Sequence, residues 1–176
     1  QLQRGFERFS FILRGEDTRE ETDLDHRVCE TLEDAEAILA EAEEDLKASR
    51  LKFVAWDAEW QGQHPMNEGS YIRTIQMSWK LKNAVCFKLR HAGGEVSFVN
   101  KFGEPAIDRL MQMLTAFMKG KRAVGHFLVA DLEWLQYFGF DLLPAFKVPT
   151  RPDKDGNPAW YRCQTGEGGF DTAMAC

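Results

Sequence analysis

Two acids at alternate positions, Asp57 and Glu59, are the residues of this chain whose spacing most directly suggests chemistry. They follow an apolar run at residues 53–56, which is typical of a buried strand and not of a sheet edge. Residues two apart on a strand point to the same face, so the two carboxylates should project together. Paired carboxylates repel unless a cation lies between them, and oxygen ligands alone favour Mg²⁺ or Mn²⁺. The pattern therefore predicts a divalent metal site, and an edge strand with two solvated acids is the alternative.

A third acid, Asp131, lies where an expected strand at residues 122–126 passes into an expected helix at residues 128–138. A side chain in the first turn of that helix can point back toward the sheet end that carries the first two acids. Acids are also common in first turns because they complement the helix dipole. Since two ligands of the same kind lie upstream, we expect Asp131 to be the third ligand.

The elements that must position these acids alternate in a recognisable order. Hydrophobic periodicity and turn residues predict three helices and six strands, with a hairpin tip at Lys82-Asn83 and loops at residues 61–70 and 144–169. A last helix, capped by Asp171 or Thr172, is expected to begin at the end of the chain. The expected strands cover residues 26–30, 51–57, 71–79, 84–89, 122–126 and 169–171, and the expected helices cover residues 32–49, 107–118 and 128–138. A three-strand meander followed by crossover helices predicts an α/β fold, a mixed sheet with flanking helices. Such sheets bind ligands at the carboxyl ends of their strands.

Composition favours one globular domain in a chain of 176 residues with 44% hydrophobic content. No stretch approaches the roughly 20 apolar residues of a membrane span, and no signal peptide is visible. We therefore expect no membrane partner and a location that is cytoplasmic (nucleoid-associated) or otherwise intracellular. The four cysteines and four histidines show no metal-ligand spacing, which argues against a zinc site. The polar start without Met suggests a piece of a longer protein.

The net charge of −6 is unevenly distributed. Residues 1–50 carry 7 basic and 15 acidic residues, a net of −8, and residues 51–176 carry 15 and 13, a net of +2. We expect residues 1–25 to be an acidic tail or linker that is flexible, and residues 26–176 to form the domain. Residues 80–122 hold nine basic and three acidic residues, which could contact phosphates, although a solvated basic surface is the more ordinary explanation.

Four motifs in order resemble the DEDD superfamily of 3′–5′ exonucleases over roughly residues 26–176. They are Asp57-x-Glu59, Ile75-Gln76-Met77, the segment from His126 through Asp131 to Gln136, and Phe170-Asp171-Thr172. Residues 56–60 and 131–136 are similar to RNase D and Werner-type exonucleases. Residues 168–172, after a long excursion, look like the proofreading domains of family A DNA polymerases.

The resemblance implies an RNase H-like fold and a metal-dependent exonuclease that hydrolyses phosphodiester bonds at the 3′ end of single-stranded DNA or RNA. Two ions, Mg²⁺ or Mn²⁺, would activate a water molecule and stabilise the leaving oxygen. By the same resemblance, Asp57 would contact both ions, Glu59 would bind one and approach the terminal 3′-hydroxyl, and Asp131 would hold the second. In a DNA polymerase-like protein this activity would be proofreading, and a downstream polymerase domain or helical domain would be the partner.

Substrate contacts are expected from Trp60, His126 and Phe127. Trp60 and the loop through Met66 are candidates to stack on the terminal base, since aromatic stacking tolerates any sequence, although a core tryptophan is an equal alternative. Phe127 departs from the family pattern, because proofreading domains often carry Asn there. Asp171 corresponds to a residue that is usually a structural cap.

The family's final motif, a fourth carboxylate with a Tyr or His that orients the water, is expected beyond Cys176. On this expectation the C-terminal part of the fold is truncated and the domain is incomplete. A nuclease-like module that binds nucleic acid or protein without cutting is therefore a further alternative. The choice between DNA and RNA also stays open.

Overall fold

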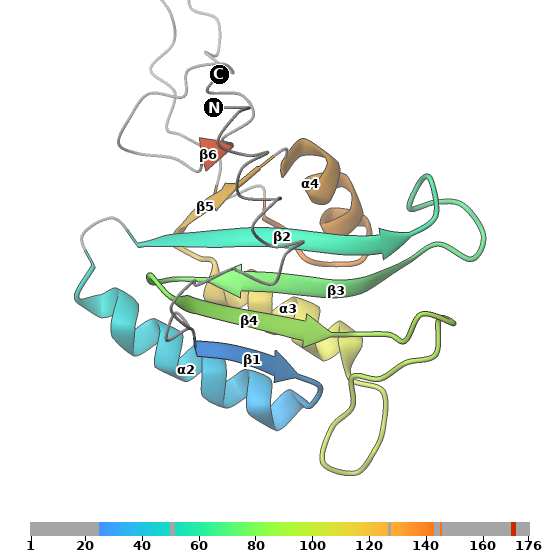
Figure 1. Cartoon of the computed structure of the whole chain (residues 1–176), viewed down its shortest axis with the longest axis horizontal. Coiled ribbons are helices and arrows are strands. Elements are labelled where there is room, and N and C mark those ends of the chain that lie inside the picture. Colours follow the sequence, from blue (N-terminus) through green and yellow to red (C-terminus); the bar gives the residue numbers. More distant parts are fainter. Residues whose placement is uncertain (1–24, 50–51, 127, 143–144, 146–169, 172–176) are drawn as a thin grey trace, which may run out of the picture.

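A six-stranded sheet with helices packed on it forms the body of the protein (Figure 1). The computed structural model describes residues 25–49, 52–126, 128–142, 145 and 170–171. The expected tail through residue 24, most of the 144–169 loop and the last helix lie outside the described residues. The elements in chain order are β1 (Asp25–Cys29), α2 (Leu32–Lys47), β2 (Phe53–Gln61), β3 (Tyr71–Ser78), β4 (Asn83–Lys88), α3 (Ile107–Phe117), β5 (Arg122–Gly125), α4 (Leu128–Tyr137) and β6 (Phe170–Asp171).

The strand order across the sheet is β1-β4-β3-β2-β5-β6. β2, β3 and β4 pair antiparallel as the expected meander, whereas β1 is parallel to β4, and β5 and β6 continue parallel from β2. Parallel neighbours need crossover connections, which α2, α3 and α4 supply. The predicted α/β mixed sheet with flanking helices, as in an RNase H-like fold, is confirmed.

Strand β2 extends to Gln61, beyond the end that was predicted at Asp57. Antiparallel pairing with β3 continues as far as Gln61 opposite Tyr71, because backbone hydrogen bonds form regardless of side-chain polarity. Along the strand, buried Val54, Trp56 and Ala58 alternate with exposed residues that include both acids. The acids therefore lie inside the strand on one face, and not at its end.

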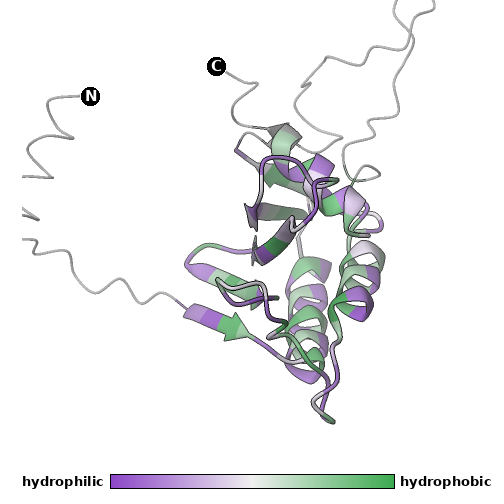
Figure 2. Ribbon diagram, turned by 90° about the vertical axis from the view of Figure 1, so that its right-hand side faces the viewer, coloured by the Kyte–Doolittle hydropathy of each residue, from purple (hydrophilic) through white to green (hydrophobic). Residues whose placement is uncertain are grey.

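The helices α2 and α3 lie on the face of the sheet that carries the buried residues (Figures 1 and 2). Helix α2 begins after its N-cap, Thr31, whose hydroxyl oxygen accepts a hydrogen bond from the Asp34 amide at 3.2 Å. Helix α3 buries Leu110, Met111 and Leu114 at helical spacing. Among the described helices, none combines the length and apolarity that crossing a bilayer demands.

The β3–β4 connection differs in detail from the predicted hairpin tip. Lys82 takes a left-handed backbone conformation, with φ of 61°, at the turn. Asn83 is not part of the tip but begins β4, where it lies in register with Asp25 of β1 and donates a side-chain hydrogen bond to it. Asn83 therefore belongs to a strand because β1 pairs with it, and the β3–β4 hairpin alone would not provide this partner.

Some basic residues of the stretch 80–122 form ion pairs with acids of the same chain. Lys80 and Lys121 form ion pairs with acids of α2, and Lys88 forms one with Glu30, which lies between β1 and α2. Lys121 is buried and also donates to the carbonyl of Phe117 at the end of α3. These contacts favour an internal, structural role for three of the nine basic residues.

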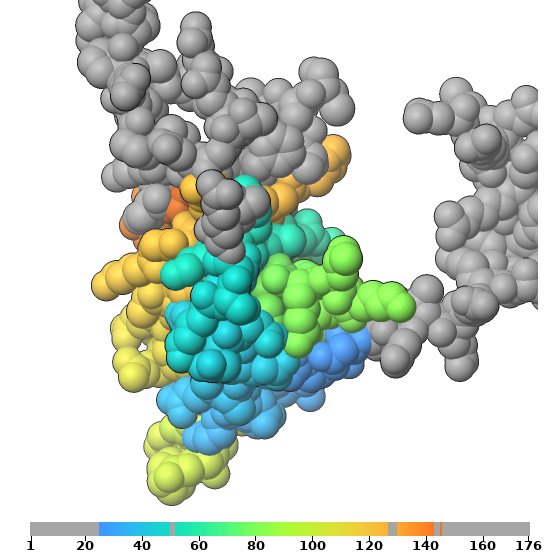
Figure 3. Space-filling model, turned by 90° about the vertical axis from the view of Figure 1, so that its left-hand side faces the viewer, coloured from blue at the N-terminus to red at the C-terminus, as the bar shows by residue number. Residues whose placement is uncertain are grey.

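Ion pairs hold the edge strand β1 against α2, at the end of the molecule seen in Figure 3. The Arg27 guanidinium donates two hydrogen bonds to the Glu41 carboxylate, at 2.6 and 3.1 Å. These bonds, with a smaller contribution from Lys80, lower the pKa of Glu41 below its ordinary value. A carboxyl whose pKa is lowered by folding stabilises the protein above its unfolded pKa, and that stabilisation is lost as the pH falls through the lowered value.

We therefore expect Glu41→Gln to lower the thermal unfolding midpoint at pH 7, with the gap to wild type closing as the solution is acidified. Thermal unfolding followed by circular dichroism at pH 7 and pH 3 measures this. The control is Glu44→Gln on the same helix, where the exposed pair with Lys47 is worth little. An equal gap at both pH values would contradict the assignment to charge.

Candidate metal centre

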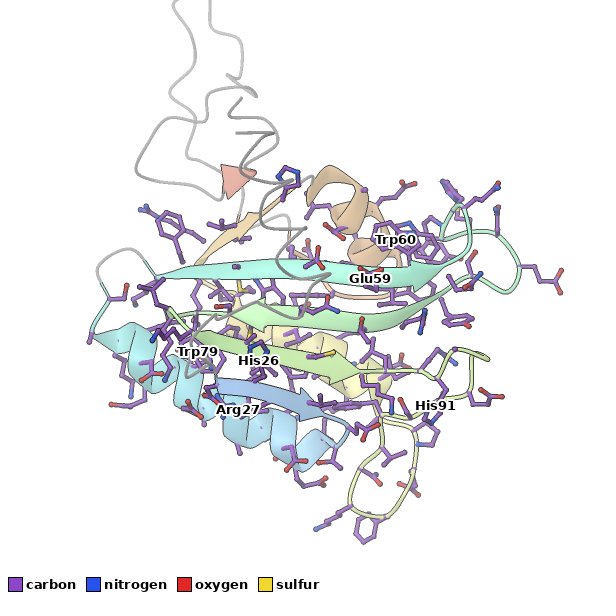
Figure 4. All side chains as sticks on the ribbon, in the orientation of Figure 1. His26, Arg27, Glu59, Trp60, Trp79 and His91 are labelled. Carbon is purple, nitrogen blue, oxygen red and sulfur yellow. The ribbon has the colours of Figure 1, made fainter. Side chains whose placement is uncertain are left out.

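The three acids singled out from the sequence line one pocket between β2 and the start of α4. The pocket has a volume of about 430 Å³, and its walls are Asp57, Ala58, Glu59, Trp60, His126, Ala130 and Asp131. Figure 4 shows Glu59 and Trp60 on the half of β2 that lies beside α4. The structure thus gathers five of the six expected site residues, and the sixth, Phe127, lies outside the described residues.

The two acids of β2 are paired across the ladder with residues of β3. Asp57 lies opposite Gln76 and Glu59 opposite Thr74, and the register then shifts so that Trp60 lies opposite Ile72. The shift leaves Arg73 as an extra residue on β3, which is a β-bulge. Trp60 continues the alternation of the buried residues of β2 and turns toward the buried side, whereas the two acids stay on the exposed face.

The acids differ in their surroundings. Asp57 and Glu59 are exposed, and no hydrogen bond or ion pair among the described residues involves their side chains. Asp131 is 5% exposed and is the only buried acid in the described part of the chain. A buried carboxylate needs favourable partners, and the first turn of α4 gives it the positive end of the helix dipole. A buried acid in a pocket is a functional-site candidate.

Among the described residues, no three His, Cys, Asp or Glu side chains converge closely enough to hold a metal ion. The expected ligands therefore share a pocket without forming a closed ligand set. The chemistry of the donors nevertheless fits a hard divalent cation, because carboxylate oxygens dominate the polar lining. The buried carbonyl oxygen of Gln76, opposite Asp57, also lacks a hydrogen-bond partner within the described structure.

Trp60 is held by α4. Its ring stacks on Trp134 with centroids 5.0 Å apart, and Trp134 stacks in turn on Phe138. Trp60 is only partly buried and still lines the pocket. It therefore combines the packing role and the pocket position that the sequence left as alternatives.

A second contact, which the sequence did not predict, joins the loop after β2 to helix α4. His64 Nε2 lies 2.8 Å from Glu133 Oε1, and the Met66 amide donates to His64 Nδ1 at 3.2 Å. Since Nδ1 accepts, the neutral ring carries its hydrogen on Nε2 and donates it to Glu133. No sequence pattern joins a loop histidine to a helix residue so far along the chain, so the link could not be predicted.

Comparison with solved structures gives weak likenesses. The chain is 10% identical to the exonuclease domain of Nibbler from Aedes aegypti (TM-score 0.42), and the match covers 68% of this chain and 47% of that one. The catalytic core of RRP6 from Trypanosoma brucei is 16% identical (TM-score 0.46; 67% and 27% covered). RNase D from Escherichia coli, described as an exoribonuclease involved in structured RNA processing, is 12% identical (TM-score 0.41; 63% and 24% covered). The chain thus spans less than half the length of these structures.

No curated protein matches the chain in sequence. Residues 29–150, however, match the family model described as 3′–5′ exonuclease. That range includes all three acids, and it confirms the resemblance inferred from the motifs. Because the match spans well over half of the chain, the protein belongs to the 3′–5′ exonuclease family of the DEDD superfamily.

Proposed function

We propose that this protein is a metal-dependent 3′–5′ exonuclease that acts on the 3′ end of single-stranded nucleic acid, with DNA proofreading in a polymerase-like protein as its role. The observation that carries the proposal is the pocket that Asp57 and Glu59 share with the buried Asp131. β2 supplies two of these acids and α4 supplies the third. A cation bound between β2 and α4 would therefore offset the negative charges of all three carboxylates.

In this proposal the three acids would hold two divalent ions, and such ions would supply water activation and stabilisation of the leaving oxygen. Asp57 and Glu59 have no described partner that competes for their oxygens. One face of Trp60 is stacked on Trp134, so its other face or its edge would meet the terminal base. His126 lies on the same pocket and is the candidate contact to the terminal phosphate.

The test is digestion of a 3′-labelled single-stranded oligonucleotide with Mg²⁺, with Mn²⁺ and with EDTA, using DNA and RNA side by side. Stepwise release of nucleoside 5′-monophosphates from the 3′ end, abolished by EDTA, is the expected result. Preference for DNA supports the proofreading role. No cleavage of either polymer by the folded, metal-loaded protein, with about 60 further residues after Cys176 included, would contradict the proposal and favour a binding module.

An RNA-processing exonuclease of RNase D type is the second candidate. Trp56–Trp60 and the segment from Asp131 to Gln136 favour it, because these residues resemble that branch of the superfamily. The same digestion separates the two candidates. Preference for RNA, together with protection of the label when the 3′ end is blocked, would assign the chain to this branch.

A further inference from the structure

Arg73 is the extra residue that the β-bulge inserts into β3. It lies between the residues paired with Glu59 and Trp60, and both of these β2 residues line the pocket. Figure 4 shows this half of β2 beside β3, with Glu59 and Trp60 labelled. Bulges are common next to active sites, where the extra residue takes its side chain out of the regular alternation. The Arg73 backbone therefore lies one strand spacing, about 4.8 Å, from the β2 wall of the pocket.

The bulge leaves the Arg73 side chain in solvent. Arg73 is exposed, whereas every other residue of β3 is buried or partly buried. Its backbone is held from the other side of the strand as well. The Arg73 carbonyl oxygen accepts hydrogen bonds from the Leu89 amide at 2.9 Å and from the Arg90 amide at 3.1 Å. A long cationic side chain thus extends into solvent from a fixed point beside the pocket.

Arg73 also differs in its charge interactions from the two basic residues next to it across the β3–β4 ladder. The Lys88 ammonium lies 2.5 Å from the Glu30 carboxylate. The Arg90 guanidinium donates a hydrogen bond to the Gly94 carbonyl oxygen at 2.9 Å. No hydrogen bond or ion pair within the described residues involves the Arg73 side chain. Its guanidinium is therefore available to a ligand.

The chemistry of the neighbouring pocket indicates which ligand this is. A nucleic acid strand carries a negative charge at every phosphate, and its 3′ end must approach a pocket lined by three carboxylates. A cation beside the pocket offsets that repulsion. An arginine is always charged and can bind a phosphate through two parallel hydrogen bonds. Phosphate contacts of this kind fix the register and orientation of a strand without reading its sequence.

We propose that Arg73 binds a phosphate of the substrate strand on the 5′ side of the scissile bond, and so holds the 3′ end at the acids. The contact is the same for every sequence, because all nucleotides share the phosphate. The inference rests on the proposed exonuclease function. It adds a substrate-binding residue on β3, outside the pocket lining.

The first measurement is binding of a labelled single-stranded oligonucleotide by fluorescence anisotropy in EDTA, with the same protein as in the digestion. Arg73→Gln should weaken binding about tenfold and should lower the salt slope by about 0.7, the value for one phosphate contact to a single strand. Arg73→Lys keeps the charge but not the planar fork, so it should lose less. Arg109→Gln is the matched control, because Arg109 is an exposed arginine on α3, outside the pocket lining. It should bind within about twofold of wild type at moderate salt.

The second measurement replaces one phosphodiester linkage at a time, near the 3′ end, by a neutral methylphosphonate. One of these replacements should weaken binding to wild type by about as much as Arg73→Gln does. The same replacement should have little further effect on Arg73→Gln, because the contact is already lost. Replacements that weaken binding to both proteins equally at every linkage would overturn the proposal.

Mn²⁺ calorimetry and the digestion separate this inference from the proposed function. Arg73→Gln should bind Mn²⁺ at least as tightly as wild type, because it removes a positive charge beside the acids. Weaker Mn²⁺ binding would place the effect of Arg73 in the metal centre and overturn the phosphate contact.

If wild type releases nucleotides and Arg73→Gln binds the oligonucleotide within twofold of wild type, the phosphate contact is wrong and the exonuclease stands. If wild type neither binds nor cleaves DNA or RNA, both are wrong. Urea denaturation of each variant shows that affinities are compared between folded proteins.

Discussion

Asp57→Asn should lower the magnesium-dependent exonuclease rate by about a thousandfold or more, because a catalytic metal ion contributes several kcal/mol and each 1.36 kcal/mol is tenfold in rate. The substitution keeps the size and the hydrogen-bonding oxygen of the side chain but removes its charge. Asp57 is exposed and has no described side-chain partner, so the fold should not depend on its carboxylate. The measurement is single-turnover release of nucleotides from a 3′-labelled strand.

Glu68→Gln is the matched control for this prediction. Glu68 is an exposed acid in the loop that follows β2, outside the pocket lining, so its neutralisation changes local charge without removing a ligand. We expect its rate to stay within about twofold of wild type at moderate salt, where exposed charges are screened. If Asp57→Asn retained full magnesium-dependent activity, the assignment of the metal centre would be wrong.

Trp134→Ala should destabilise the protein by about 3–5 kcal/mol, the usual cost of truncating a large buried aromatic side chain. Trp134 is 3% exposed and lies between the rings of Trp60 and Phe138. Its loss removes apolar burial and two stacking contacts at once, and it opens the wall that holds Trp60. Urea denaturation gives the free energy of unfolding, and near-ultraviolet circular dichroism reports the tryptophan packing.

Tyr137→Ala on the same helix is the comparison for Trp134. Tyr137 is 55% exposed and touches only the edge of Phe138 among the described rings, so its loss should cost less than about 1 kcal/mol. Equal destabilisation by the two substitutions would show that α4 is not held through the tryptophan stack. In that case the pocket walls would be joined mainly by the pairing of β2 with β5.

The parts of the site that the sequence predicted follow from local periodicity. The period of two along β2 is enough to place Asp57 and Glu59 on one face, and it does not depend on where the strand ends. Asp131 was predicted from a strand passing into a helix, and the structure puts it in the first turn of α4. The α/β order could be predicted for the same reason, because each element carries its own pattern.

The features that were missed depend on partners distant in sequence. The end of β2 is set by its pairing with Tyr71, and the bulge at Arg73 depends on the register between two strands. The contact between His64 and Glu133 joins a loop to a helix, and neither residue stands out locally. Gln76 belonged to a recognised motif, but its place opposite Asp57 needed the strand register.

The two walls of the pocket lie far apart along the chain, which has a consequence for biosynthesis. The acids of β2 leave the ribosome well before Asp131, and at about 5–20 residues per second the wait is roughly 4–14 s. During that interval Trp60 has no Trp134 to stack on, and the nascent chain carries only half of the pocket. Long-range pairing also slows folding itself. The chain should therefore acquire its pocket late, after the β2–β3–β4 meander has formed.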